Sequence, residues 1–586
     1  MKQDMRALVL LNSLSSGYRE GTEIVLPYLE HFGIPYVMVD LASSPLPQPA
    51  ADHALIVVAH RHLDPAGLRL GPTGRRMLLA ALWSGTGLVS FDPDLPSSAE
   101  LGIPAPARRN VEVDRIELSP HAQWITARHE PGQIIPLVGS MHVPQLPAEK
   151  DEILLKAGEA PLVAARSFGQ GRLVRWATLN WYPTDVLGPM AGLDDVFWRS
   201  LVWAARKPFA MRGLPPLVSM RVDDVAGRGG LFGQSPLYWV HESNKSGFKP
   251  WLGLFIYNLT EPAVVELGDL LDRGKATAFP HAFGRPPRDG ASDYHYYPKA
   301  LPLRASTYDE FIYFDHSRGR PWSDLEAARG LRAVDEWYAD HEPLPKSPYA
   351  LGHWYEMGGN VMAHIQDRWC ADLIGKGIDL NRPLTDDVPW IKTGPFRRYG
   401  PAGTCFFDPA RRGTRPIYYA DFVNLAGRQF FNCITEIRDV AGYEWKPDND
   451  VPGTVDRGAR TLRRALDSMA LAVLFTHETD FINLIRPEAW AAEISQVAAR
   501  VAEYDPIYVT LDEGVRYVRA TRTSRLGQCS FDPTSGEARV VVQGRSDMTT
   551  HFHLFAESGG EVRSQLVELP AFAGQTSVTC RAPQAA

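Results

Sequence analysis

The sequence predicts an α/β protein with three unequal domains: a parallel-sheet domain over residues 1–212, a deformed (β/α) barrel over residues 213–525, and a small β-sandwich over residues 526–586. Strand-like and helix-like segments alternate in the first two regions, as they do in parallel sheets covered by helices. Pro215 and Pro216 indicate a linker, because proline interrupts helices and central strands alike. The last region instead shows short alternating strands with glycine-rich turns.

Composition and charge narrow the possible classes of protein. Of the 586 residues, 45% are hydrophobic and 22% charged, which predicts several buried cores and excludes wholesale disorder. The net charge of −7 argues against a nucleic-acid partner. We expect no membrane span, because every apolar run is shorter than about 20 residues. The start lacks a secretory cleavage site, so we expect a cytoplasmic location, or an extracytoplasmic one if a leader was removed. The oligomeric state stays open.

The first domain is expected to contain a parallel sheet. Short runs rich in Val, Leu and Ile are typical of strands buried on both faces. Such runs occupy residues 7–11, 36–41, 54–59 and 87–91, with amphipathic helices expected over residues 20–32 and 74–83. A hairpin over residues 161–179 and a helix over residues 193–204 are expected to complete the domain.

The segments VAARSFGQGRLVRWATL and DDVFWRSLVWAARKPF in this region resemble class I glutamine amidotransferase-like, flavodoxin-like domains. Members of that family carry a nucleophilic cysteine at a strand-to-helix turn. The first cysteine of this chain is Cys370, so the resemblance implies an accessory domain without glutaminase activity, either structural or ligand-holding.

Polar side chains follow the predicted strands of the middle domain. Barrel enzymes place their chemistry at the carboxyl ends of such strands. Here the strand over residues 217–222 leads to Asp223 and Asp224, that over 276–280 leads to His281, and that over 469–476 leads to His477. Adjacent carboxylates raise each other's pKa unless something compensates, and a divalent cation does so. Asp223 and Asp224 therefore suggest one metal ligand and one free base, or else two solvated turn carboxylates.

The sequence RVDD at residues 221–224 resembles the Thr-Phe-Asp-Asp motif of the polysaccharide deacetylase family (NodB homology, carbohydrate esterase family 4). The resemblance implies that Asp223 is the catalytic base and Asp224 a metal ligand. His281 stands where the family has the first histidine of His-Ser/Thr-x-x-His, whereas Arg285 replaces the second. A zinc site with three protein ligands therefore needs another residue.

The segment SPYALGHWYEMGGN supplies that candidate, His353. Glu356 nearby either completes the metal site or binds sugar, and Trp354 and Tyr355 are candidates for stacking on a pyranose ring. Alternatively, His353 caps a turn beside core aromatic residues. The expected cofactor is a divalent metal, zinc first, with nickel or cobalt possible.

Two further segments resemble later motifs of the deacetylase family. FRRYGP at residues 396–401 resembles its Arg-Pro-Pro-Tyr-Gly turn, which implies that Arg397 or Arg398 pairs with the catalytic base and that the backbone near Tyr399 holds the oxyanion. Ordinary loop arginines are the alternative. LAVLFTH at residues 471–477 resembles the closing strand, which implies that His477 is the general acid. Asp480 is expected to orient its imidazole, although Glu478 is also close enough.

The resemblance to polysaccharide deacetylases implies a metal-dependent hydrolase that removes acetyl groups from an N-acetylated or O-acetylated carbohydrate. A non-catalytic carbohydrate-binding protein is one alternative, suggested by Arg285 in place of a histidine. A glycoside hydrolase is another, with Asp223 or Asp224 acting together with Glu356. The insertion at residues 285–348 is rich in Tyr, Asp and Arg, which suits a sugar-binding wall or a packed hairpin.

Overall fold

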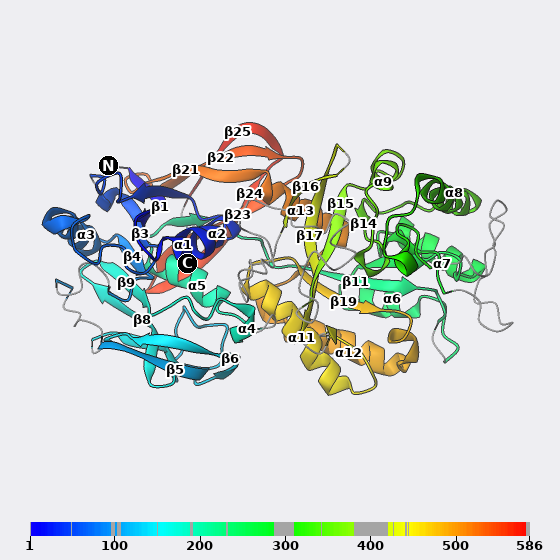
Figure 1. Cartoon of the computed structure of the whole chain (residues 1–586), viewed down its shortest axis with the longest axis horizontal. Coiled ribbons are helices and arrows are strands. Elements are labelled where there is room, and N and C mark those ends of the chain that lie inside the picture. Colours follow the sequence, from blue (N-terminus) through cyan, green and yellow to red (C-terminus); the bar gives the residue numbers. More distant parts are fainter. Residues whose placement is uncertain are drawn as a thin grey trace. The chain divides into compact units, whose positions relative to one another are not determined.

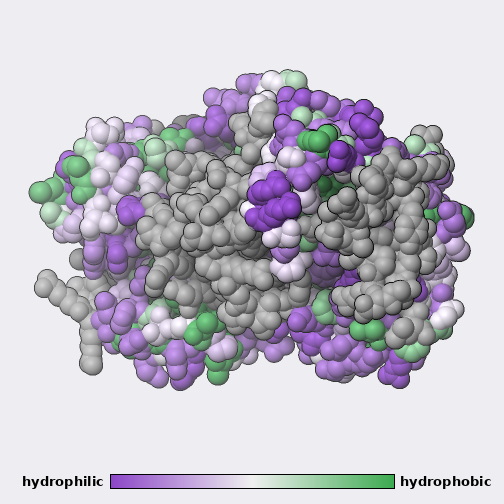
Figure 2. Space-filling view, turned by 45° about the vertical axis from the view of Figure 1, so that its right-hand side comes forward, coloured by the Kyte–Doolittle hydropathy of each residue, from purple (hydrophilic) through white to green (hydrophobic). Residues whose placement is uncertain are grey.

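The computed structural model has a mixed α/β architecture with parallel sheets (Figure 1). It describes residues 2–581 except 49, 95–99, 102–106, 149, 188–190, 230–231, 286–309, 342, 380–419, 426, 440–441 and 444. These residues form two compact units, one from residues 2–215 and 520–581 and one from residues 216–519. On the face shown in Figure 2, hydrophilic residues dominate the coloured surface, and hydrophobic ones form small separate groups.

The first unit contains the predicted parallel sheet. Five parallel strands run in the order β2-β1-β3-β4-β9, an order found in doubly wound sheets. Their bounds are β1 (Gln3–Leu11), β2 (Tyr36–Asp40), β3 (His53–Val58), β4 (Gly87–Ser90) and β9 (Gly171–Trp176). The helices of this region are α1 (Tyr18–Glu20), α2 (Leu26–His31), α3 (Gly71–Trp83), α4 (Thr184–Leu187) and α5 (Asp194–Ala204). The βαβ series predicted from the hydrophobic runs is confirmed.

Antiparallel strands extend this sheet beyond β9. The predicted hairpin is present, with β8 antiparallel to β9 and a turn that places Gly169 in the left-handed region. The additional strands are β8 (Ala160–Phe168), β7 (Glu152–Ala157), β5 (Ala107–Leu118) and β6 (Ile134–Gln145). The sheet is therefore parallel at its centre and antiparallel toward β6.

The carboxyl-terminal strands belong to the first unit, which corrects the expectation of a separate β-sandwich over residues 526–586. β21 pairs with β1, and β23 pairs with β10 (Phe209–Met211). The strands are β21 (Ser524–Asp532), β22 (Glu537–Ser546), β23 (Thr550–Ser558), β24 (Glu561–Leu569) and β25 (Phe572–Arg581). Their apolar side chains share one core with Met5 and Ala210, so amino-terminal residues cover a face that the segment alone would leave exposed.

The second unit is built on a parallel sheet in the order β13-β12-β11-β19, with β20 beside β11. The strands are β11 (Leu217–Val225), β12 (Pro250–Phe255), β13 (Thr277–Ala282), β19 (Ala472–His477) and β20 (Ile507–Tyr508). Every residue of β11 and β12 is buried, which explains their nearly continuous apolar sequence. Thr260 caps α7 (Glu261–Asp272) by accepting a hydrogen bond from the Ala263 amide.

A second sheet lies in the same unit. β14, β15 and β17 are parallel, and β16 and β18 are antiparallel to β17. The strands are β14 (Tyr349–Ala350), β15 (Leu373–Asp379), β16 (Ala420–Leu425), β17 (Arg428–Asp439) and β18 (Gly442–Tyr443). The Ser347 amide donates to the Ala278 carbonyl at 2.7 Å, linking β13 to the segment before β14, and β17 lies beside β19. No closed hydrogen-bonded barrel is formed by the strands that the structure describes.

Helices follow the strands of the second unit. They are α6 (Tyr238–Lys245), α8 (Asp324–Asp340), α9 (Met362–Trp369), α11 (Val451–Asp467), α12 (Pro487–Arg500) and α13 (Leu511–Arg522). α8 lies within the predicted insertion at 285–348, of which residues 286–309 and 342 are outside the described part. Among the helices described, none combines the length and apolar character needed to cross a membrane.

Candidate metal centre

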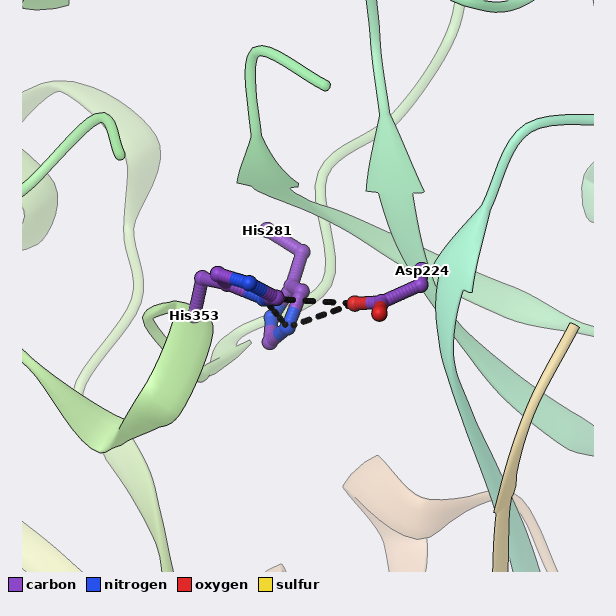
Figure 3. A group of neighbouring side chains, drawn as sticks. All are labelled: Asp224, His281 and His353. Atoms are coloured by element: carbon purple, nitrogen blue, oxygen red, sulfur yellow. Dashed lines mark hydrogen bonds and ion pairs between the residues drawn. The ribbon is translucent and has the colours of Figure 1, made fainter. Parts of the chain in front are cut away.

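Asp224, His281 and His353 converge on one point in the second unit (Figure 3). Asp224 lies near the end of β11, His281 lies in β13, and His353 begins the 3-10 turn His353–Tyr355 after β14. His353 Nδ1 lies 3.1 Å from His281 Nε2 and 3.2 Å from Asp224 Oδ1, and the latter two atoms are 3.5 Å apart. All three side chains are buried. Residues far apart in sequence thus present three ligand atoms to a single point.

The triangle of ligand atoms fits a small divalent cation. Zinc binds imidazole nitrogen and carboxylate oxygen at about 2.0–2.2 Å, so two ligands of a tetrahedral site lie about 3.3 Å apart. The three observed separations of 3.1, 3.2 and 3.5 Å match that edge length. The three atoms can therefore occupy three corners of a tetrahedron and leave the fourth for water or substrate. Two imidazoles and one carboxylate also suit cobalt, nickel or iron(II).

The outer nitrogen of each histidine ring is held by a hydrogen-bonding partner. His281 Nδ1 lies 2.9 Å from the Leu351 carbonyl oxygen, and His353 Nε2 lies 3.2 Å from Glu310 Oε1. Metal-binding histidines usually have such a partner, which fixes the ring and its tautomer. No spacing in the sequence indicated Glu310, which precedes His353 by 43 residues.

Asp223 lies beside the triad and is held by Arg221. The guanidinium binds both carboxylate oxygens, with Nε 2.9 Å from Oδ1 and Nη2 2.6 Å from Oδ2. Asp223 Oδ2 is also 3.8 Å from His281 Nε2. Burial alone would raise the pKa of Asp223, but the charge and hydrogen bonds of Arg221, together with the nearby His281 and His477, outweigh burial, so the pKa lies below its ordinary value. A buried, ionised carboxylate thus stands next to the three ligand atoms.

Arg221 is completely buried and connects Asp223 to other polar groups. Nη1 donates to the Tyr355 hydroxyl at 2.9 Å and to Thr435 Oγ1 at 3.1 Å. Nη2 lies 3.3 Å from Glu436 Oε2, which also accepts a hydrogen bond from Tyr355. Buried, charge-assisted bonds of this kind fix geometry strongly.

Arg221, the partner of Asp223, was not among the residues predicted from the sequence. The predicted partners Arg397 and Arg398, together with Tyr399, lie outside the described residues. A signal for Arg221 was present, because residues two apart on a strand point to the same face. Arg221 and Asp223 have that spacing on β11.

The residues after His353 have different roles from those expected. The Tyr355 side chain is buried within the Arg221 network, which corrects the prediction that its ring stacks on sugar. Trp354 is 48% exposed, and its stacking on a sugar stays a prediction. Glu356 is buried, and its Oε2 lies 2.9 Å from His316 Nδ1, so this carboxylate is directed to His316 and not to the triad.

His477 lies next to Asp223 in the sheet, because the two residues are paired in the parallel register of β19 and β11. Burial lowers the pKa of His477 below its ordinary value. The predicted role of Asp480 is corrected, since its exposed carboxylate binds Arg285, with Nη1 3.1 Å from Oδ1. Arg285 therefore lies in an ion pair.

The alternative orienting residue, Glu478, also has other partners. Its buried carboxylate accepts hydrogen bonds from the Gly227 amide at 2.8 Å and Trp239 Nε1 at 3.0 Å, and from the Ala226 amide. These bonds fix the loop between β11 and α6. Glu478 therefore supports the end of β11, which carries Asp223 and Asp224.

Left-handed backbone conformations cluster at the site. Asp224, Trp354 and Tyr355 have φ angles of 55°, 54° and 62°. Such values are uncommon for residues other than glycine and cost on the order of 1–3 kcal/mol each. Strain of this kind often accompanies functional sites and here involves one ligand and the two residues after another.

Comparisons with known proteins give limited similarity. No protein-family model and no curated protein match the chain. Among solved structures, cytoplasmic protein STM1381 of Salmonella typhimurium LT2 has a TM-score of 0.26 and 14% identity over 35% of this chain and 100% of its own. A ThuA-like protein of Parabacteroides merdae has a TM-score of 0.26 and 12% identity over 34% of this chain and 90% of its own. A β-galactosidase of Bacillus circulans has a TM-score of 0.22 and 13% identity over 34% of this chain and 30% of its own.

Proposed function

We propose that this protein is a metal-dependent hydrolase that removes acetyl groups from an N-acetylated or O-acetylated carbohydrate. One observation carries the proposal: three ligand atoms with the spacing of a tetrahedral site lie beside Asp223, a carboxylate that Arg221 holds in place. Zinc is the first candidate for the metal, with nickel and cobalt as alternatives. The order of Asp223, Asp224, His281 and His477 along the chain supports the resemblance to polysaccharide deacetylases.

The proposed chemistry divides the work among neighbouring residues. When bound, a divalent cation supplies Lewis acidity toward a carbonyl oxygen and makes water more acidic. Asp223 accepts the proton of the attacking water, and Arg221 keeps that carboxylate ionised and oriented. His477, beside Asp223 in the sheet, donates a proton to the leaving amine or alkoxide. General acid–base catalysis of this kind typically contributes about 10²–10⁴-fold to the rate.

The arrangement of strands supports the proposed family. The parallel sheets β13-β12-β11-β19 and β14-β15-β17 have neighbouring edges at β13 and β14 and at β17 and β19. This order is the one expected for a deformed barrel of the NodB type whose hydrogen bonding is interrupted at two places. For the first unit we propose a flavodoxin-like, amidotransferase-like accessory role.

The carbohydrate part of the proposal is supported by Trp354. Its exposed ring lies 5.1 Å from the His316 ring and 6.3 Å from the His353 ring, measured between centroids. An exposed aromatic ring beside a polar site is suited to stacking on the apolar face of a sugar. Trp354 is therefore proposed to bind the substrate next to the metal.

The test measures acetate release from chito-oligosaccharides and from O-acetylated xylan after loading with zinc, cobalt or nickel. We expect release by the wild type, and a loss of at least 100-fold in Asp223→Asn and in His477→Ala. Asp269→Asn is the matched control, because Asp269 forms an exposed ion pair with Arg273. No release from any substrate contradicts the proposal. Glycan binding without release then supports a carbohydrate-binding protein, and release of reducing ends supports a glycoside hydrolase.

A further inference from the structure

We infer that Glu310 is a positioning residue of the metal centre. Its carboxylate holds the His353 ring so that Nδ1 faces the same point as Asp224 and His281. The inference rests on the part of the proposed function that assigns a metal to this site, and it adds a residue to which neither the sequence nor the comparisons assign a role.

The two ring nitrogens of His353 have different partners. Nε2 lies 3.2 Å from Glu310 Oε1, whereas Nδ1 lies 3.2 Å from Asp224 Oδ1 and 3.1 Å from His281 Nε2. A neutral imidazole has one N–H group and one lone pair. A carboxylate at Nε2 keeps the proton on that nitrogen and leaves the Nδ1 lone pair for a cation.

The backbone of Glu310 explains how its carboxylate reaches this position. The Phe283 amide donates to the Glu310 carbonyl at 2.8 Å, and Phe283 follows His281 by two residues. The next residue, Phe311, packs its ring 4.9 Å from the His353 ring, between centroids. The segment that carries Glu310 is therefore attached directly beyond the end of β13, the strand that carries His281.

The two histidines differ in the nature of their outer partner. His281 donates to the Leu351 backbone carbonyl, which a side-chain substitution leaves in place. His353 instead has a carboxylate, which also increases the electron density on the ring. Glu310 is thus the outer partner that mutagenesis can remove, and its loss frees His353 to rotate while keeping every ligand.

The experiment compares zinc affinity of the full-length wild type, Glu310→Ala and Glu310→Gln by competition with a chromophoric chelator at fixed pH. Glu266→Gln is the matched control, because Glu266 Oε1 lies 2.9 Å from His241 Nε2 in the same unit, and neither residue belongs to the triad. The visible spectrum of the cobalt-loaded proteins reports ligand geometry independently of activity. Thermal unfolding of the metal-free proteins reports any general loss of stability.

We expect a loss of zinc affinity of about 10–100-fold in Glu310→Ala, a smaller loss in Glu310→Gln, and none in Glu266→Gln. The cobalt spectrum should change in Glu310→Ala alone. Glu310→Gln keeps an acceptor oxygen and decides the question if the alanine variant unfolds. Wild-type affinity in both Glu310 variants overturns the inference. Failure of the wild type to bind metal overturns it together with the proposed function, whereas tight binding without acetate release overturns the proposed function alone.

Discussion

Replacing Arg221 by methionine is expected to destabilise the second unit strongly. Arg221 compensates two buried carboxylates, Asp223 and Glu436, and also donates to Tyr355 and Thr435. Methionine fills much of the volume but leaves both carboxylates without their cation. Removing one partner of a buried ion pair typically costs about 3–5 kcal/mol, because the remaining charge stays desolvated. We therefore expect Arg221→Met to lower the free energy of unfolding by about that amount.

Hydrogen exchange followed by mass spectrometry is the suitable assay, because a chain of two compact units need not unfold in one step. Peptides covering β11 and β19 report the second unit separately from the first. Arg273→Met is the control, since its exposed ion pair with Asp269 is expected to contribute less than about 1 kcal/mol. Arg221→Lys should give an intermediate loss, because lysine keeps the charge without the two-pronged geometry.

The double variant Arg221→Met with Asp223→Asn separates the ion pair from simple packing. If the charge of Asp223 causes the loss, asparagine should restore part of the stability. The network does not depend on this buried cation if Arg221→Met lowers the free energy of unfolding by less than about 1 kcal/mol. Equal protection from hydrogen exchange in Arg221→Met and in the control Arg273→Met would refute the dependence as well.

Three further predictions concern the same unit. Zinc at 1,000 times its Kd should stabilise the wild type by about 4 kcal/mol in exchange measurements, and His353→Ala should abolish this gain; equal stabilisation of both proteins contradicts the assigned ligand. Burial raises the pKa of Asp512 to about 7 despite its 2.5 Å hydrogen bond from Ser347. The folded state therefore favours the protonated carboxyl, and the stability that this group contributes is complete below about pH 4 and lost as pH rises to about 7. Between pH 4 and 8, the free energy of unfolding of Asp512→Asn should therefore increase by on the order of 4 kcal/mol relative to that of the wild type. If the difference between the two proteins does not change with pH, the prediction is wrong. Trp354→Ala should raise KM for acetylated oligosaccharides by about tenfold with little change in kcat, and an unchanged KM excludes the stacking role.

Local patterns predicted the parts of the molecule that depend on short stretches of sequence. The buried parallel strands were recognisable because both of their faces are covered, which makes their sequence apolar throughout. Asp224 and His281 were recognisable because each lies at or near the carboxyl end of such a strand, where neighbouring parallel strands bring side chains together.

Contacts between distant segments were not predictable in the same way. Glu310 meets His353 only because its backbone is bonded to Phe283, and no spacing in the sequence encodes that contact. The carboxyl-terminal strands looked like an independent sandwich because their alternation does not show which residues cover the inner face. Arg221 is different, since its spacing from Asp223 was visible and its role became clear only when Tyr355 and Glu436 were seen around it.

The partners of Arg221 have a consequence for how the protein is made. This residue lies early in the second unit, but its partners come from residues 355, 435 and 436, and Asp223 lies beside residue 477. During synthesis, more than 200 further residues must therefore be added after Arg221 and Asp223 before all of their partners are present. A chain that ends before residue 436 lacks Glu436 and also β19, the strand that carries His477. Completion of the candidate metal centre should therefore occur late in the synthesis of each chain.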